Sequence, residues 1–239
     1  STRERDVLLA ALNGVLGDRL AATGNALATP MSLHVRGEAT GRILLVVHGL
    51  CMNDLQWQAQ HDGEPVDHGQ TLAAHGWTPV YARYNSGLHI SQNGRQFAEE
   101  VERLVAGWPV PVKELAVVAH SMGGLVTRSA MHIASGARWM GFVSRIVFLA
   151  TPHHGAPLEK IGNGVDRLLA QTSFSRPFAA LGQIRSAGVT DLRYGFLTDA
   201  DWTGRDRFVR QPDTREVVPL PEGVACYAIA TTIAGAGVA

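Results

Sequence analysis

Short, continuous apolar runs, separated by segments of helical length, constrain the fold more than any other feature of this sequence. Four runs are clear and a fifth follows after a gap of about seventy residues; they are Ile43–His48, Pro79–Tyr84, Leu115–His120, Arg145–Ala150 and Val224–Thr231. A strand that is apolar along its whole length is buried on both faces, and strands separated by helices pair in parallel through right-handed crossovers. We therefore predict an α/β fold with a doubly wound, mostly parallel sheet.

The segments between these strands predict helices. Apolar residues at three- and four-residue spacing from Val7 to Leu20 indicate a helix within the first thirty residues, and Pro30 closes that region. A weakly alternating stretch, Met31–Val35, is a further strand candidate. Three more helices are expected, over Leu55–Gly76, Gln92–Val105 and Met122–Ala134. Together these elements form one domain over residues 1–239.

The gap between the fourth and fifth strands, Thr151–Gly223, differs from the rest of the chain. Its first half has apolar residues at helical spacing, and its second half is rich in charged and aromatic residues. A connection of this length inside a compact domain usually has a function. Four large apolar side chains are too many for a solvated connection: Phe174, Phe178, Leu181 and Trp202. We expect a cap or lid over the carboxyl ends of the strands that lines an apolar cleft.

The composition argues against several classes of function. Lys plus Arg equals Asp plus Glu at 21 each, so no net field attracts nucleic acid. No apolar run approaches the roughly 20 residues that span a bilayer, and no signal peptide is visible. The compartment and the oligomeric state stay open. Cys51 and Cys226 are expected to be buried small residues, and the ten histidines lack metal-ligand spacing, so neither metal nor cofactor is expected.

A serine stands at the apex of a predicted strand, turn and helix, in the segment Ala119–Gly124. Such a turn projects the hydroxyl away from the sheet, and the free N–H groups of the helix start favour a developing oxyanion. Ala119 and Gly123 keep the flanking positions small, so strand and helix can approach each other. A helix N-cap is the alternative interpretation, but it leaves the adjoining His120 unexplained. We therefore predict that Ser121 is a nucleophile.

A histidine–glycine pair, His48 and Gly49, ends the first strong strand. The glycine lets the chain turn close to the nucleophile. The expected oxyanion donors are the backbone N–H groups of Leu50 and Met122. We interpret His48 as a brace of this loop and not as a base, and we expect His120 to pack under the serine turn.

Three segments together resemble the bacterial lipase and GPI inositol-deacylase-like branch of the α/β-hydrolases, which are serine esterases: Val46–Leu50, Ala119–Gly124 and Phe148–Gly155. The Thr-Pro-His-His-Gly turn in the third segment is the most specific part of the resemblance. The resemblance implies hydrolysis of acyl lipids or related small-molecule esters without a cofactor. It also implies that His153 and His154 line the site and are not the general base.

The acid and the histidine of a serine triad do not follow Ser121 in the order that this fold uses. No Asp or Glu lies between Ser121 and His154, and no histidine follows His154. Three interpretations are open: a chain that lacks the C-terminal strand and helix of a longer enzyme, an inactive relative, or an unusual base such as His153 or His154. The first is favoured, because Gly235–Ala239 ends abruptly after a core strand while the serine turn is intact.

The leading hypothesis is ester hydrolysis through an acyl-enzyme on Ser121. A noncatalytic module that binds an apolar ligand is one alternative, because a fold alone does not define a function. An acyltransferase or thioesterase is the other, because the same groups support those reactions.

Overall fold

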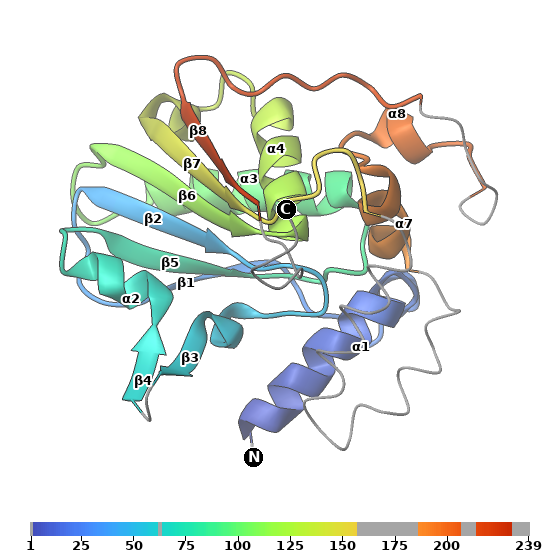
Figure 1. The fold of residues 1–239 in the computed structure, drawn as a ribbon, viewed down its shortest axis with the longest axis horizontal. Coiled ribbons are helices and arrows are strands. Elements are labelled where there is room, and N and C mark those ends of the chain that lie inside the picture. The colour runs from blue at the N-terminus through green and yellow to red at the C-terminus, as the bar shows by residue number, and fades with distance from the viewer. Residues whose placement is uncertain (1, 62–63, 157–185, 207–213, 231–239) are drawn as a thin grey trace, which may run out of the picture.

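The computed structural model describes residues 2–61, 64–156, 186–206 and 214–230, and its centre is a six-stranded sheet (Figure 1). The strand order is β1-β5-β2-β6-β7-β8, with the strands Ser32–Val35 (β1), Arg42–Val47 (β2), Thr78–Arg83 (β5), Glu114–His120 (β6), Val143–Leu149 (β7) and Ala225–Ile229 (β8). All neighbouring pairs from β5 to β8 are parallel, while β1 runs antiparallel to β5 at one edge. The predicted α/β fold with a doubly wound, mostly parallel sheet is confirmed.

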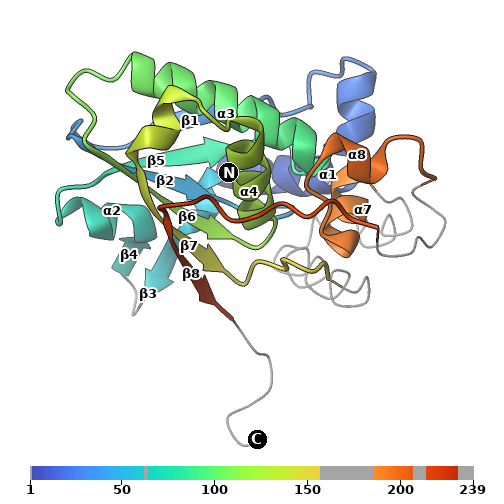
Figure 2. The ribbon, with the colours of Figure 1, turned by 90° about the horizontal axis from the view of Figure 1, so that it is seen from above.

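Helices lie on both faces of this sheet, with α3 and α4 on one face and α2 on the other (Figure 2). The helices are Thr2–Ala22 (α1), His68–Ala73 (α2), Ile90–Ala106 (α3), Met122–Ile133 (α4), Ala187–Tyr194 (α7) and Asp199–Trp202 (α8), and two 3₁₀ turns are Asp54–Trp57 (η1) and Arg138–Phe142 (η2). The expected first helix and the helices after the second and third strong strands are confirmed, with ends shifted by a few residues.

Strand β2 shows why the continuous apolar runs form the centre of the sheet. Each residue of Ile43–Val47 is at most 3% exposed. Alternate side chains point to opposite faces, so the odd-numbered residues join the larger cluster with α3 and α4, and the even-numbered residues pack with Trp57 and Trp77. Full burial of one such side chain stabilises the fold by about 1.5–3 kcal/mol. Strand β2 therefore stabilises the domain through both faces.

The helix expected over Leu55–Gly76 is wrong for most of its length. The segment instead contains η1, a two-stranded hairpin and α2, with Gln58–His61 (β3) paired to Glu64–Asp67 (β4). Proline lacks a backbone N–H and disrupts a helix interior, so a helix cannot run through Pro65. Helix α2 begins after Asp67, because the Asp67 carboxylate accepts hydrogen bonds at 3.1 Å from the N–H groups of the two residues that follow His68.

Helices α7 and α8 belong to the segment predicted to be a lid. They lie beyond the carboxyl ends of the strands, where α7 packs against α1 and α3 (Figure 1). The Trp202 ring stacks on His89 with 3.7 Å between centroids, and its indole N–H donates to Ser91 Oγ at 3.0 Å. The other large side chains expected to line the cleft lie outside the described residues: Phe174, Phe178 and Leu181. The lid over an apolar cleft stays a prediction.

Strand β8 forms an edge of the sheet in the described part of the chain. Tyr227 and Ile229 are 54% and 52% exposed. Cys226 is only partly buried, contrary to expectation, because an edge strand has a neighbour on one side only. Thr231 and the Gly235–Ala239 tail lie outside the described residues. Within the described ranges, no helix is long and apolar enough to cross a membrane.

Candidate active site

Ser121 joins β6 to α4 in a backbone conformation that few residues other than glycine adopt. Its φ is 52° and its ψ is −122°, which costs on the order of 1–3 kcal/mol. The Ser121 N–H donates to the Leu149 carbonyl at 2.8 Å, and the Gly124 N–H donates to the Ser121 carbonyl at 3.0 Å. The expected strain is confirmed. The Ser121 side chain makes no N-cap hydrogen bond, which removes the support for the helix-cap interpretation.

Two glycines let the end of β2 reach the serine turn. A Cβ on Gly123 would overlap the carbonyl oxygens of Val47 and His48. A Cβ on Gly49 would lie 3.1 Å from the Cβ of Ser121, which is closer than ordinary van der Waals contact. The chain after β2 and the serine turn therefore touch through backbone atoms, and a larger residue at either glycine would push them apart.

His48 braces this contact from within the core. Its ring is fully buried and stacks on Tyr84 with 4.1 Å between centroids. Its Nδ1 lies 2.8 Å from the Gly49 carbonyl oxygen and its Nε2 lies 3.4 Å from the Tyr84 N–H, so Nδ1 donates and Nε2 accepts. Burial lowers the pKa of His48 to about 4. A neutral ring with both nitrogens engaged cannot serve as the general base, in agreement with the interpretation of His48 as a brace.

The His48 hydrogen bond also orients the first expected oxyanion donor. The Gly49 carbonyl accepts from His48 Nδ1 and from the Met52 N–H, the latter at 3.4 Å. In a trans peptide the carbonyl and the N–H point in opposite directions, so these bonds also fix the direction of the Leu50 N–H. Leu50 and Met122 are 6% and 0% exposed. Convergence of their N–H groups on the Ser121 hydroxyl stays a prediction.

Cys51 follows in a left-handed conformation, with a φ of 58°. Its N–H donates to Ser86 Oγ at 3.0 Å, which ties the turn to the loop after β5. The side chain is 2% exposed, as expected, and burial raises the pKa of the thiol to about 12. Cys51 therefore stays protonated and does not compete with Ser121 as a nucleophile.

His120 packs beside the serine turn, as expected. Its ring meets Trp57 edge to face with 6.4 Å between centroids. Burial lowers the pKa of His120. Its Nδ1 is buried and has no hydrogen-bond partner in the described part of the chain. The ring is therefore neutral near pH 7, and packing accounts for its position.

His153 and His154 follow β7 and differ in environment. The His153 Nδ1 lies 3.3 Å from Arg128 Nη1, and its ring meets Phe148 edge to face. Burial, Arg128 and His154 all lower the pKa of His153. A guanidinium beside the ring disfavours the imidazolium that a general base must become, so His153 is a poor base. His154 is exposed to solvent.

A histidine–carboxylate pair that the sequence analysis missed joins α3 to α7. The His89 Nδ1 lies 3.0 Å from Asp191 Oδ2, and this carboxylate oxygen also accepts from the Ile90 N–H at 2.8 Å. Burial raises the pKa of Asp191. The two partners are 102 residues apart, so no local pattern indicates the pairing. Since Trp202 also covers the His89 ring, the pair anchors α7 and α8 on the start of α3.

In the ranges that the structure covers, no group of three or more His, Cys, Asp or Glu side chains is placed to hold a metal ion. The absence of a cofactor stays an expectation from the sequence.

Comparison with protein families gives one match. The family described as PGAP1-like alpha/beta domain matches residues 95–221, a range that covers more than half of the chain and includes Ser121. No curated protein matches this chain in sequence.

Several solved structures are similar to this chain at low sequence identity. The lipase BlEst2 of Bacillus licheniformis in mature form is 21% identical with a TM-score of 0.47, over 71% of this chain and 63% of that chain. An esterase of Pyrococcus furiosus is 16% identical with a TM-score of 0.40, over 68% of this chain and 61% of that one. A lipase-esterase related protein of Clostridium acetobutylicum is 13% identical with a TM-score of 0.41, over 72% and 74%. The match spans less than two thirds of the length of the first two proteins.

Proposed function

This chain belongs to the PGAP1-like alpha/beta domain family, and from that premise we propose that it hydrolyses carboxylic esters, as a lipase or esterase does, through an acyl-enzyme on Ser121. One observation carries the proposal. Ser121 is held at a φ of 52° between β6 and α4, with Gly49 against it, and a serine on a strand-to-helix turn of this kind is typical of a nucleophile whose hydroxyl lies near free N–H groups. Strain of this kind is retained where the surrounding structure requires it, which favours a reactive role over a structural one.

The proposed reaction uses the groups around this turn. The Ser121 Oγ attacks the ester carbonyl carbon, and the carbonyl oxygen becomes an oxyanion that accepts hydrogen bonds from the Leu50 and Met122 N–H groups. The carbon–oxygen bond to the alcohol then breaks, and the alcohol leaves with the proton that the Ser121 hydroxyl lost on attack. Water then adds to the acyl-enzyme, so that the acid keeps the water's hydroxyl group and Ser121 Oγ regains a proton. Neither His48 nor His153 is proposed as the base, because His48 is buried and neutral and His153 lies beside Arg128.

Two other functions use the same groups. A noncatalytic module would bind an apolar ligand without attack by Ser121, and an acyltransferase or thioesterase would pass the acyl group to another acceptor or cleave a thioester. The substrate class proposed here is a small-molecule ester or a lipid.

Covalent labelling tests the proposal. A fluorophosphonate probe should modify the protein at Ser121, found by peptide mass spectrometry, and the Ser121→Ala variant should not be labelled. A panel of p-nitrophenyl esters of increasing acyl length should show turnover that Ser121→Ala removes when it is measured on protein that includes the acid and the histidine of a triad; without these two groups the rate should be far lower. Folded wild-type protein with neither labelling nor turnover would contradict the proposal, whereas labelling with turnover only on thioesters or with an alcohol acceptor would favour the alternatives.

A further inference from the structure

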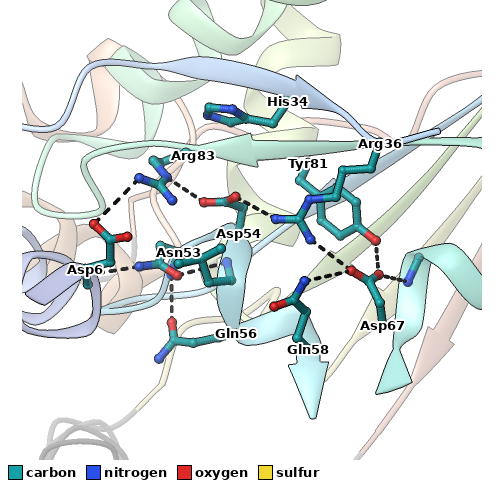
Figure 3. Close-up of polar contacts among 12 residues, drawn as sticks. Asp6, His34, Arg36, Asn53, Asp54, Gln56, Gln58, Asp67, Tyr81 and Arg83 are labelled. Carbon is teal, nitrogen blue, oxygen red and sulfur yellow. Dashed lines mark hydrogen bonds and ion pairs between the residues drawn. The ribbon is translucent and has the colours of Figure 1, made fainter. Parts of the chain in front are cut away.

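An ion-pair network lies next to the turn that carries the Leu50 N–H (Figure 3). The Asp54 carboxylate accepts hydrogen bonds from two guanidinium groups, with Arg36 Nη2 at 2.9 Å from one oxygen and Arg83 Nε donating to the other. Arg36 also reaches Asp67 Oδ2 at 2.9 Å. The Asp54 side chain is only 4% exposed. Charge-assisted hydrogen bonds in such a site hold geometry well, because little water competes for the groups.

The network fixes the downstream end of a very short segment. Asp54 begins η1, and the preceding Asn53 caps the same turn through its side chain and donates to the Asp6 carbonyl at 3.0 Å. His48, stacked on Tyr84, fixes the upstream end. Only four residues, 49–52, connect the two fixed ends, so their backbone has little freedom.

The two ends are also connected through β5. Arg83, which bonds Asp54, is the last residue of β5 and directly precedes Tyr84, whose ring covers His48. A shift of Asp54 would therefore act on both ends of the four-residue turn. The backbone of this turn is strained at Cys51, a non-glycine residue with a φ of 58°, so the turn needs contacts that keep it in place.

From this arrangement we propose that Asp54, clamped by Arg83 and Arg36, is a positioning residue that holds residues 49–52 so that the Leu50 N–H faces the oxyanion. The inference rests on the proposed function. Asp54 acts through the turn and does not contact the reacting atoms. Its loss should therefore reduce the rate of the chemical step more than it reduces substrate binding.

The chain provides a matched control at the opposite end of the sheet. Glu114, at the start of β6, also accepts from two arginines, Arg42 Nε at 2.9 Å and Arg145 Nη2 at 2.9 Å. Glu114→Gln and Asp54→Asn each remove one negative charge from a carboxylate that two arginines bind, although the Glu114 side chain is 21% exposed and that of Asp54 only 4%. Loss of the ion pairs should therefore lower the free energy of unfolding in both variants, and more in Asp54→Asn. Only Asp54 adjoins the turn, so an effect on positioning should appear only in Asp54→Asn.

Ester turnover is the first test. With p-nitrophenyl butyrate, Asp54→Asn should lower kcat at least tenfold with KM within twofold of wild type, and Glu114→Gln should keep both within twofold. Arg83→Gln removes one of the two arginines that bind Asp54 and should also lower kcat. It provides a second variant if Asp54→Asn does not fold. The double variant should have a kcat close to that of Asp54→Asn, because both changes break the same Asp54–Arg83 contact and the other ion pair of Arg83, with Asp6, is longer at 4.0 Å.

Hydrogen exchange is the second test and does not depend on activity. The amides of Cys51 and Met52, which donate to Ser86 Oγ and to the Gly49 carbonyl, should exchange at least tenfold faster in Asp54→Asn or Arg83→Gln than in wild type, and at an unchanged rate in Glu114→Gln. Unchanged kcat and unchanged exchange in the folded Asp54 and Arg83 variants would overturn the inference while the wild type still hydrolyses esters. If the wild type neither hydrolyses esters nor is labelled, the proposed function fails, and the exchange rates alone decide whether Asp54 holds the turn.

Discussion

Replacement of Gly123 by alanine tests the close approach of β2 to the serine turn. The added Cβ would overlap two carbonyl oxygens, those of Val47 and His48, and backbone atoms of a buried strand end cannot rotate away. Overpacking of this kind costs about 3 kcal/mol at the upper end of its usual range. Alanine has a better helix propensity than glycine, and this difference offsets about 0.5–1 kcal/mol of the cost of overpacking. We therefore expect a net loss of about 2 kcal/mol in the free energy of unfolding.

The control is Gly141→Ala in η2, where an added Cβ meets nothing within 4 Å. That variant should be neutral or up to about 1 kcal/mol more stable. Guanidinium unfolding followed by tryptophan fluorescence measures the difference, and the melting temperature of Gly123→Ala should fall by about 4–8 °C. Labelling of Ser121 by a fluorophosphonate should also slow in Gly123→Ala. Equal stability of the two variants would refute the argument that strand and helix touch at Gly123.

Two further predictions concern buried ionisable groups. His48 has a pKa of about 4 in the folded protein against 6.5 for a free histidine, so the unfolded chain binds the proton first as the pH falls. The stability that the neutral His48 ring gives to the folded state is fully present above pH 6.5. About 3 kcal/mol of the free energy of unfolding should be lost as the pH falls from 6.5 to 4. The His48→Asn variant should show a flatter pH dependence in denaturant titrations, and an identical slope would contradict the assignment. The Asp191→Ala variant loses the buried partner of His89, so its free energy of unfolding should fall by about 3 kcal/mol and residues 187–202 should become open to limited proteolysis. The control Glu100→Gln breaks an exposed pair with Arg103 and should change the free energy of unfolding by less than about 0.5 kcal/mol. Resistance of Asp191→Ala to the protease would count against the anchoring role.

The elements whose structure depends on residues close to one another in the sequence could be predicted from the sequence. The strands β2, β5, β6 and β7 follow from continuous apolar runs, because burial on both faces requires apolar side chains at every position. The serine turn follows equally from a local pattern, since Ala119 and Gly123, two residues before and after Ser121, are small where strand and helix meet. The helix predicted over Leu55–Gly76 is wrong, because Pro65, a helix breaker, lies within the segment and the chain there forms the β3–β4 hairpin.

The contacts between distant segments could not be predicted. His89 and Asp191 lie 102 residues apart, and neither residue has neighbours that mark it as one half of a pair. Likewise, no local pattern marks Asp54 or Arg83 as partners, although they form an ion pair next to the turn of residues 49–52. The antiparallel direction of β1 is a third case, because four residues of weak alternation carry no information on which strand they pair with.

The sequence by itself determined the class of fold, the position of the nucleophile candidate and the need for small residues around it, because backbone sterics and side-chain periodicity act over a few residues. Only the tertiary structure decided which charges meet, which histidine is neutral and how the Gly49 peptide is oriented. Those properties depend on burial and on partners contributed by other elements, as for His48, whose pKa is lowered by the surrounding core and whose ring is held by Tyr84. A side chain has such an environment only after the chain has folded around it.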